Sequence, residues 1–195
     1  MVNAGKRYEN CTLENFDASD NPEAMEAARL LLEDRINGLL ITGPSGRGKT
    51  HFMVGLGRAY EREGGIVVQP NPATGHDEAR RVPPRTVAFW PVLELVGDLR
   101  GCVSGRADDP EPGCRAASLL LLDDFGAENT TDFAFEALRR IIEHRHREMK
   151  PIVLTTNLTA AEWVARYQDQ MISRLSEGGR IVQMRGRDRR PEMGR

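Results

Sequence analysis

The sequence is poor in cysteine and in aromatic residues, and it carries no large excess of charge of either sign. Its 195 residues contain 3 cysteines, 6% aromatic residues and a formal net charge of −2. Cys11, Cys102 and Cys114 are an odd number of thiols without metal-ligand spacing, so we interpret them as reduced thiols of a cytoplasmic protein. Because the overall charge does not demand a nucleic-acid partner, any basic binding surface must be local.

Long apolar runs, an N-terminal signal segment and internal repeats are also missing. No run approaches the length of a membrane span, so we expect a protein without a membrane-spanning or secretory segment. With 39% apolar and 29% charged residues, a chain of 195 residues can form one globular domain with a substantial core.

The most specific motif is a glycine-rich loop between an apolar run, Leu39–Thr42, and a helix-compatible run, His51–Glu63. It matches the pattern G-x-x-x-x-G-K-[ST] of the phosphate-binding P-loop. Its residues are Gly43, Pro44, Ser45, Gly46, Arg47, Gly48, Lys49 and Thr50. A strand before the loop and a helix after it are the context that this motif requires, so the sequence predicts a nucleotide site over these residues and His51.

The chemistry of this loop follows from its residue types. Glycines allow successive backbone N–H groups to approach a phosphate, and the helix that follows adds the partial positive charge of its N-terminus. We expect Lys49 to bridge the β- and γ-phosphates of ATP. We expect the hydroxyl of Thr50 to be a ligand for Mg²⁺.

Two acidic residues follow the apolar run Leu119–Leu122. An uninterrupted apolar run is typical of a strand buried on both faces of a parallel sheet, and such sheets bind ligands at the carboxyl ends of their strands. Asp123 is therefore a candidate Mg²⁺ ligand. Asp124 is a candidate general base for the water that attacks ATP.

A second buried strand, Ile152–Thr156, ends at Asn157, which we expect at the same sheet edge, close to the γ-phosphate or the attacking water. Thr159 and Glu162 have the spacing of a capping box, which predicts the start of a helix. The preceding helix, predicted from Asp132 to Met149, has a basic end. It is interpreted either as a solvated helix terminus, which we favour, or as a phosphate-backbone contact.

Two further segments remain open to alternative interpretations. The polar N-terminal stretch from Arg7 to Asp17 carries Tyr8, Leu13 and Phe16 and forms either an arm that packs on the core or a wall of the base pocket. Residues 69–85 contain four prolines and read as a surface excursion. This excursion is either an insertion into one strand or a short strand pair.

Taken together, these motifs resemble an AAA+ ATPase, and more narrowly the DnaC/DnaI-type helicase loaders and their IstB-type transposition relatives. The segments that carry the resemblance are Tyr8 to Phe16, Gly43 to His51, Leu119 to Glu128, Ile152 to Leu158 and Arg174 to Arg190. The resemblance implies an α/β, three-layer P-loop NTPase fold with a central parallel five-stranded sheet. The P-loop strand is then expected between the Asp123 strand and the last strand.

The resemblance also assigns roles to three further residues. Asn157 matches sensor 1, Arg174 in Ser173-Arg174-Leu175 matches the arginine finger that completes a neighbouring subunit's site, and Arg190 lies where the family carries its sensor 2 arginine. Arg185, Arg187 or Arg189 could take the place of Arg190. The expected organisation is an N-terminal arm over 1–20, an AAA+ domain over 21–190 with little or no C-terminal lid, and a tail over 191–195.

The function that the resemblance implies is hydrolysis of Mg-ATP in a homo-oligomer that acts on a replicative DNA helicase and on single-stranded DNA. One alternative is an IstB-like ATPase that acts on duplex DNA with a transposase. Two others are a P-loop kinase of a small molecule and a nucleotide switch with negligible turnover, since Asp124 is a shorter base than glutamate. The family's helicase-gripping N-terminal module is not evident before the predicted domain.

Overall fold

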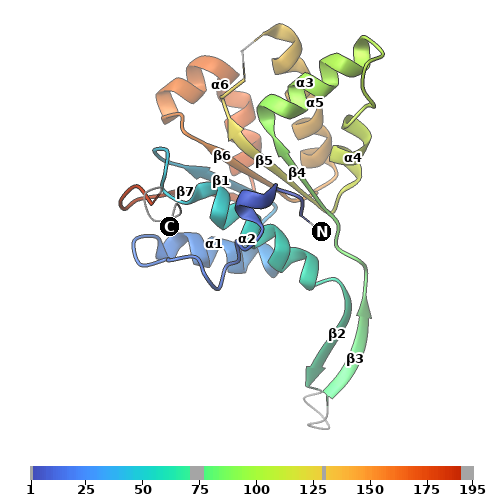
Figure 1. The fold of residues 1–195 in the computed structure, drawn as a ribbon, viewed down its shortest axis with the longest axis vertical. Coiled ribbons are helices and arrows are strands. Elements are labelled where there is room, and N and C mark those ends of the chain that lie inside the picture. Colours follow the sequence, from blue (N-terminus) through green and yellow to red (C-terminus); the bar gives the residue numbers. More distant parts are fainter. Residues whose placement is uncertain (1, 71–76, 129–130, 190–195) are drawn as a thin grey trace.

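A five-stranded parallel sheet forms the centre of the molecule in the computed structural model, which describes residues 2–70, 77–128 and 131–189. Its strands lie in the spatial order β4-β5-β6-β1-β7 (Figure 1). Their bounds are β1 Gly38–Thr42, β4 Val87–Pro91, β5 Leu119–Phe125, β6 Ile152–Thr156 and β7 Gly179–Gln183. The order puts β1 between β5 and β7, as predicted, with β6 as the direct neighbour of β1 on the β5 side.

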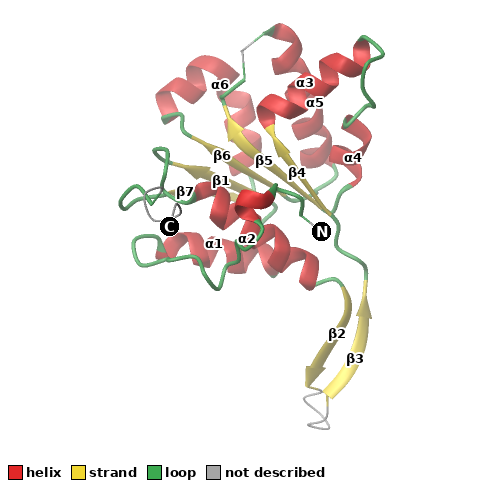
Figure 2. Ribbon diagram, in the orientation of Figure 1, coloured by secondary structure: helices red, strands yellow, loops and turns green. Residues whose placement is uncertain are grey.

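Helices cover both faces of this sheet, which gives the three layers that the family resemblance implied (Figure 2). One face carries α1 (Pro22–Leu32) and α2 (Lys49–Arg62). The other carries α3 (Val92–Val103), α4 (Glu111–Ala116), α5 (Asp132–Arg147) and α6 (Ala160–Ser176). A short 3₁₀ helix, η1 (Lys6–Tyr8), precedes them.

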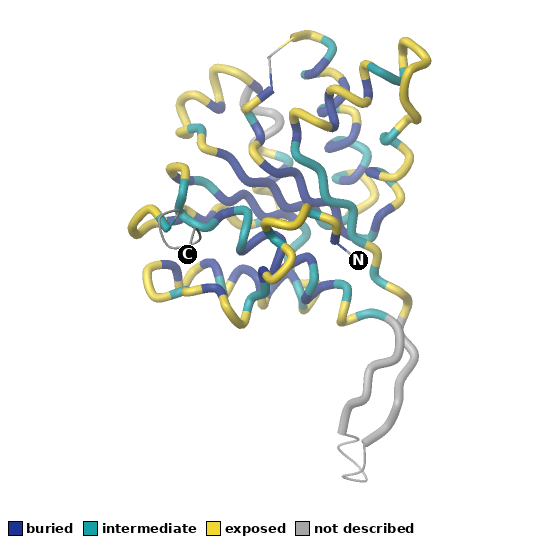
Figure 3. Tube along the Cα trace, in the orientation of Figure 1, coloured by how far each residue is buried: buried dark blue, intermediate teal, exposed yellow. Residues whose placement is uncertain are grey.

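The apolar strands supply both layers of the core, because successive side chains of a strand point to opposite faces. Leu39 and Ile41 pack in the cluster that contains α1 and α2, whereas Leu40 packs in the cluster that contains α3, α5 and α6. Leu119 and Leu121 are divided from Leu120 and Leu122 in the same way. Figure 3 shows the central strands as the most continuous buried part of the chain.

The excursion after α2 is a strand pair. β2 (Gly65–Pro70) and β3 (Asp77–Val82) pair antiparallel in a two-stranded sheet of their own, and Figure 1 shows this ribbon extending away from the body. The sheet strand β4 is a separate element that begins at Val87. The excursion is therefore not an insertion into one strand: it contains β3, which forms a short strand pair with the preceding β2.

Several local expectations need correction. The composition of the polar segment 104–112, with its glycine and two prolines, indicates a loop, but α4 begins at Glu111. Asparagine followed by proline is typical of a helix start, and Asn21 does precede α1. Its side chain nevertheless does not cap the helix: Nδ2 donates to the carbonyl of Arg185 at 3.3 Å and Oδ1 accepts from the Arg185 N–H at 2.7 Å. The capping box of Thr159 and Glu162 is confirmed at the start of α6, which continues without a break to Ser176.

The basic end of α5 is largely neutralised by intramolecular contacts. Arg139 pairs with Glu136 and Glu143, and Arg140 pairs with Glu111. These ion pairs favour the structural interpretation of this segment over a phosphate-backbone contact. Within the described ranges, no helix has the length and apolar character needed to cross a membrane.

Arg145, also in this basic segment, is fully buried and joins three elements. Its Nη1 donates to the carbonyls of Cys114 and Ala117 at 2.8 and 2.9 Å, and its Nη2 donates to those of Ser118 and Pro151 at 3.2 and 2.6 Å. Burial lowers the pKa of Arg145 to about 10, so the guanidinium stays charged at neutral pH. It therefore satisfies four carbonyls around the starts of β5 and β6.

We expect Arg145→Met to lower the free energy of unfolding by about 3 kcal/mol or more, because it leaves several buried carbonyls without a donor. Arg145→Lys retains a charge but not the fork of donors. Its free energy of unfolding should therefore lie between those of Arg145→Met and the unaltered protein. Urea unfolding followed by circular dichroism measures this. The matched control is Arg147→Met, whose side chain is 71% exposed and should cost less than about 0.5 kcal/mol. A loss below about 1 kcal/mol for Arg145→Met would contradict the role given to this residue.

Candidate functional site

Most of the predicted phosphate-binding residues border a cleft of about 430 Å³; Gly43, Pro44 and Arg47 are not among its lining residues. It lies beyond the carboxyl ends of β1, β5 and β6, where open parallel sheets bind their ligands. Its walls come from four parts of the chain: the N-terminal arm, the P-loop, the ends of two strands and the C-terminal segment. The lining residues include Tyr8, Phe16, Gly46, Gly48, Lys49, Thr50, His51, Asp124, Asn157 and Arg189.

Lys49 is at the centre of the phosphate-binding part. Its side chain is buried, and Nζ donates to the carbonyls of Gly43 and Pro44 at 2.7 and 2.9 Å and to Oδ1 of Asn157 at 2.6 Å. These contacts tie the loop after β1 to the end of β6. The turns of the loop are produced by positive φ angles of 131° at Gly43, 81° at Gly46 and 84° at Gly48. Residues other than glycine rarely adopt such angles.

Asp123 lies at the end of β5 and meets two hydroxyl donors from other elements. Thr155 donates to its Oδ1 at 2.5 Å, and Thr50 reaches both carboxylate oxygens at 3.0 Å. Burial raises the pKa of Asp123, the hydrogen bond from Thr155 lowers it, and the neighbouring charge of Asp124 raises it again. The net effect is a raised pKa of Asp123. The hydrogen bonds from the two hydroxyls oppose this shift by stabilising the ionised carboxylate at a buried position.

Asp124 is exposed and points into the cleft, with a backbone φ of 54° that non-glycine residues seldom adopt. Its N–H donates to Oγ1 of Thr155 at 2.9 Å, its carbonyl accepts from Ala127, and its Oδ1 accepts from Nδ2 of Asn157 at 3.2 Å. Thr155 thus contacts both acidic residues. The side chains of Asp124 and Asn157 are held together at the edge of the cleft.

The donor set at Thr50 and Asp123 suits a magnesium ion bound together with ATP. Mg²⁺ takes oxygen ligands and is commonly held by one or two protein groups while phosphates and waters fill the remaining positions. One hydroxyl and one carboxylate that are 3.0 Å apart meet this description. Among the described residues, no group of three or more His, Cys, Asp or Glu side chains could hold a metal by itself.

The N-terminal arm both packs on the core and borders the cleft, so the two interpretations of it are compatible. Phe16 is buried against Phe52 with ring centroids 5.2 Å apart, and Tyr8 and Phe16 line the cleft. Nε2 of His51 lies 2.8 Å from Oδ1 of Asn15 and 3.2 Å from the Thr12 carbonyl, and burial lowers the His51 pKa. His51 therefore fastens the arm to the start of α2.

The C-terminal segment passes beside the P-loop. The N–H of Arg189 donates to the Gly46 carbonyl at 2.9 Å, and its guanidinium lies 3.1 Å from Asp17 and over the ring of Phe16. Arg47 turns away from the cleft and donates to the carbonyl of Gly186. Arg190, the predicted sensor 2 residue, lies outside the described residues; the C-terminal arginine that borders the cleft is Arg189.

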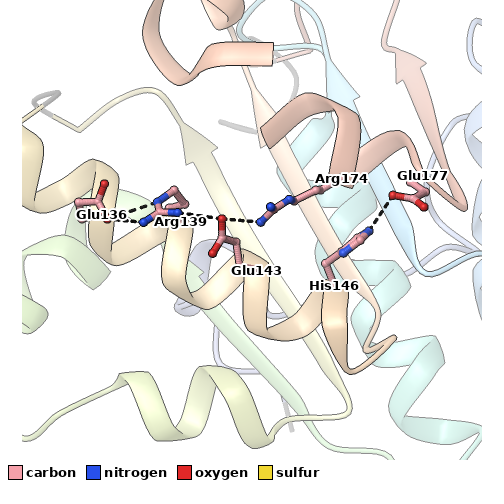
Figure 4. Close-up of polar contacts among 6 residues, drawn as sticks. All are labelled: Glu136, Arg139, Glu143, His146, Arg174 and Glu177. Carbon is pink, nitrogen blue, oxygen red and sulfur yellow. Dashed lines mark hydrogen bonds and ion pairs between the residues drawn. The ribbon is translucent and has the colours of Figure 1, made fainter. Parts of the chain in front are cut away.

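Arg174 lies away from the cleft of its own chain. It is the third-last residue of α6, beside Leu175, whose carbonyl lies against Gly38 at the start of β1. Since the P-loop follows the other end of β1, the two are separated by the length of that strand, roughly 13 Å. The guanidinium forms an ion pair with Glu143 of α5 (Figure 4).

The segment after Asp124 packs against α6, the helix that carries Arg174. Phe125 stacks on Trp163 with centroids 4.9 Å apart, and the hydroxyl of Tyr167 donates to the buried carboxylate of Glu128. Arg166 donates to the Gly126 carbonyl at 2.8 Å. The start of α6 therefore contacts the segment that follows the acidic pair, and its end carries Arg174.

Comparisons with solved structures identify this architecture. The chain superposes on the DnaC helicase loader with a TM-score of 0.73 at 21% identity, over 93% of this chain and 100% of that one. The fold is that of an AAA+ P-loop NTPase. DnaI superposes with a TM-score of 0.71 at 17% identity, over 93% of this chain and 91% of that one. DnaA bound to AMPPCP and single-stranded DNA also superposes at 0.71, with 20% identity, over 94% of this chain and 52% of DnaA.

Sequence relatives that are named as ATP-binding proteins also match most of this chain. A protein of Mycobacterium tuberculosis named as an ATP-binding protein in an insertion sequence is 27% identical over 172 residues, which are 83% of this chain and 59% of that protein. A Pseudomonas aeruginosa protein named as an ATP-binding protein of insertion sequence IS21 is 25% identical over 169 residues, 83% of this chain and 56% of that protein. The chain thus spans less than two thirds of either relative, and no family model matches it. The resemblance to helicase loaders and IstB-type proteins is confirmed.

Thr155 was not among the residues that the motifs singled out, although it contacts both members of the acidic pair. A signal for it was present, because alternate residues of a strand share a face and Thr155 is two residues before Asn157. What was missing was the pairing of β5 with β6, which brings Thr155 to Asp123. Glu128 and Tyr167 were missed because their contact depends on the packing of α6 against the segment after β5.

We expect Thr155→Val to weaken Mg²⁺ binding to the ATP complex about tenfold, because it removes a hydrogen bond to a carboxylate. Loss of this donor raises the pKa of Asp123 further, so the defect should be larger at pH 6 than at pH 8, since the metal requires the ionised form. Titration of Mg²⁺ against a fluorescent ATP analogue measures both effects. Thr155→Ser keeps the hydroxyl and should restore binding; equal defects in the two variants would refute the role of the hydroxyl.

Proposed function

We propose that the chain binds and hydrolyses Mg-ATP as a subunit of a homo-oligomer. The observation that carries this proposal is the convergence of Lys49, Asp123, Asp124 and Asn157 in one hydrogen-bonded network at the cleft. The network contains a cation for the phosphates, oxygen ligands for Mg²⁺ and a carboxylate beside an amide. The ATP-binding names of the relatives and the AMPPCP bound in DnaA support ATP as the nucleotide.

In the proposed reaction, a water attacks the γ-phosphorus in line with the bond to ADP. The new O–P bond forms as the bond to ADP breaks, and Asp124 accepts the proton of the water. Asn157 orients the water, and Lys49 leaves the Gly43 and Pro44 carbonyls to contact the β- and γ-phosphates. Thr50 and Asp123 would hold Mg²⁺, which would neutralise phosphate charge. Arg189, and Arg190 beyond the described part, are the C-terminal candidates for a phosphate contact.

Arg174 is proposed to act in trans. Its position at the amino end of β1 keeps it from the cleft of its own chain, whereas a neighbouring subunit could bring its own cleft to it. A guanidinium at the γ-phosphate stabilises the charge that develops in the transition state. Each complete site would then combine the cleft of one subunit with Arg174 of the next.

The biological task that we propose first is loading of a replicative DNA helicase with contact to single-stranded DNA. The superposition on the DnaC helicase loader, over 93% of this chain, supports it. The alternative is an IstB-like ATPase that acts on duplex DNA with a transposase. That alternative is favoured by the two insertion-sequence relatives, and the cytoplasm suits either task.

Mixing two inactive variants tests hydrolysis in trans. We expect Lys49→Ala to lose ATP binding and Arg174→Ala to bind ATP without turning it over. In an equimolar mixture, about one quarter of the sites combine an intact cleft with an intact arginine, so activity should return. Phosphate release without any added acceptor is the measurement. Strict dependence on an acceptor would indicate a kinase. Absence of turnover in the unaltered protein would indicate a nucleotide switch. If mixing restores no activity, action in trans is excluded.

Asp124→Asn should bind ATP but fail to hydrolyse it, and so retain partners that bind the ATP state. Capture with this variant from the source cell is expected to recover a replicative helicase, with Lys49→Ala as the control that cannot enter the ATP state. Recovery of a transposase, together with preference for duplex over single-stranded DNA in a binding assay, would favour the IstB-like alternative instead.

A further inference from the structure

Four charged side chains of alternating sign form a continuous row where α5 meets the end of α6 (Figure 4). Arg139 pairs with Glu136 at 2.8 Å and with Glu143 at 3.0 Å, and Glu143 also pairs with Arg174. The side chains of Glu143 and Arg174 are 32% and 36% exposed. The row therefore lies at the surface, where another subunit can reach it.

Arg139 and Arg174 contact the same atom, Oε1 of Glu143, each through Nη1. The carboxylate consequently keeps a cationic partner if one of the two arginines departs. Breaking an ion pair is expensive mainly when it leaves a charge without a partner. Here Arg139 remains in place, and the pair is partly exposed, so release of Arg174 from Glu143 is inexpensive.

A γ-phosphate is a stronger partner for Arg174 than Glu143 is. It carries more negative charge and offers several acceptor oxygens to the guanidinium fork. Glu143 and a phosphate would repel each other if both stayed close to the same guanidinium. Binding of Arg174 to the phosphate of a neighbouring subunit therefore favours its separation from Glu143.

We propose that Glu143 masks Arg174 in a subunit without a neighbour and releases it to the γ-phosphate in the cleft of an adjoining subunit. This inference rests on the proposed action of Arg174 in trans. Arg139 takes over the neutralisation of Glu143 when the exchange occurs. A neighbour that holds ADP lacks the competing phosphate, so Arg174 stays on Glu143 and the contact between the subunits is weaker.

The test is the dependence of ATPase activity on protein concentration. Glu143→Gln keeps the size of the side chain but removes its charge, and should lower the concentration for half-maximal activity about two- to fivefold, the range expected for a partly exposed pair. Arg139→Gln leaves Glu143 with Arg174 as its arginine partner in the row, and should raise that concentration by a similar factor. The opposite directions distinguish a mask from a general loss of stability.

The matched control is Glu177→Gln. Glu177 follows the end of α6, is three residues from Arg174 and pairs with His146 at 3.1 Å, so its replacement removes the same charge without removing the Glu143 contact. It should leave the concentration dependence unchanged. Thermal unfolding of each variant verifies that the fold is retained.

Two outcomes overturn the proposal: an unchanged concentration dependence in Glu143→Gln, or a decrease in activity, which would mean that Glu143 aids Arg174. Arg174→Ala distinguishes failure of the mask from failure of the proposed function. If Arg174→Ala is as active as the unaltered protein, action in trans is wrong. If Arg174→Ala is inactive while Glu143→Gln behaves like the unaltered protein, only the mask is wrong.

Discussion

The candidate site depends on the burial of one carboxylate. Asp123 is 7% exposed at the end of a strand that is otherwise apolar, and such a group is tolerated only when donors surround it. Its donors are Thr50, from the first turn of α2, and Thr155, from the neighbouring strand. The P-loop helix, β5 and β6 must therefore meet at this point. The same contacts place Lys49, Asp124 and Asn157 around one cleft.

The parts of the site that the sequence predicted lie in short segments whose chemistry is local. Spacing alone predicts the role of the glycines and Lys49 of the P-loop, and that of the acidic pair after four leucines. The role of Asn157 as sensor 1 was assigned from the resemblance. Its location was predicted because the carboxyl ends of parallel strands lie at one edge of the sheet. Individual strands followed from apolar runs that are long enough for strands and too short for helices, whereas the five-stranded sheet and its order were implied by the family resemblance. Each of these signals comes from neighbouring residues.

What the sequence did not reveal depends on contacts between distant residues. Asparagine is a common N-cap residue and Asn21 precedes a helix, yet its side chain binds the backbone of Arg185, 164 residues away. Arg145 looked like one cation of a basic helix end, and only the packed fold shows it buried beneath four carbonyls. The start of α4 was obscured because prolines at positions 110 and 112 are typical of loops, although proline is also accepted in a first helical turn. Arg189 became prominent only once the C-terminal segment was seen beside the P-loop.

The placement of the cleft and of Arg174 at opposite ends of one sheet has a consequence for assembly. Two copies related by a two-fold axis would present identical surfaces to each other, whereas contact of an arginine end with a cleft end joins unlike surfaces. An assembly built on that contact is polar and grows as a ring or as an open helix. In an open helix, the first and last subunits differ: one keeps a cleft without an incoming arginine, and the other keeps an arginine without a cleft. The two ends of such a filament are then chemically distinct, so the filament has a direction.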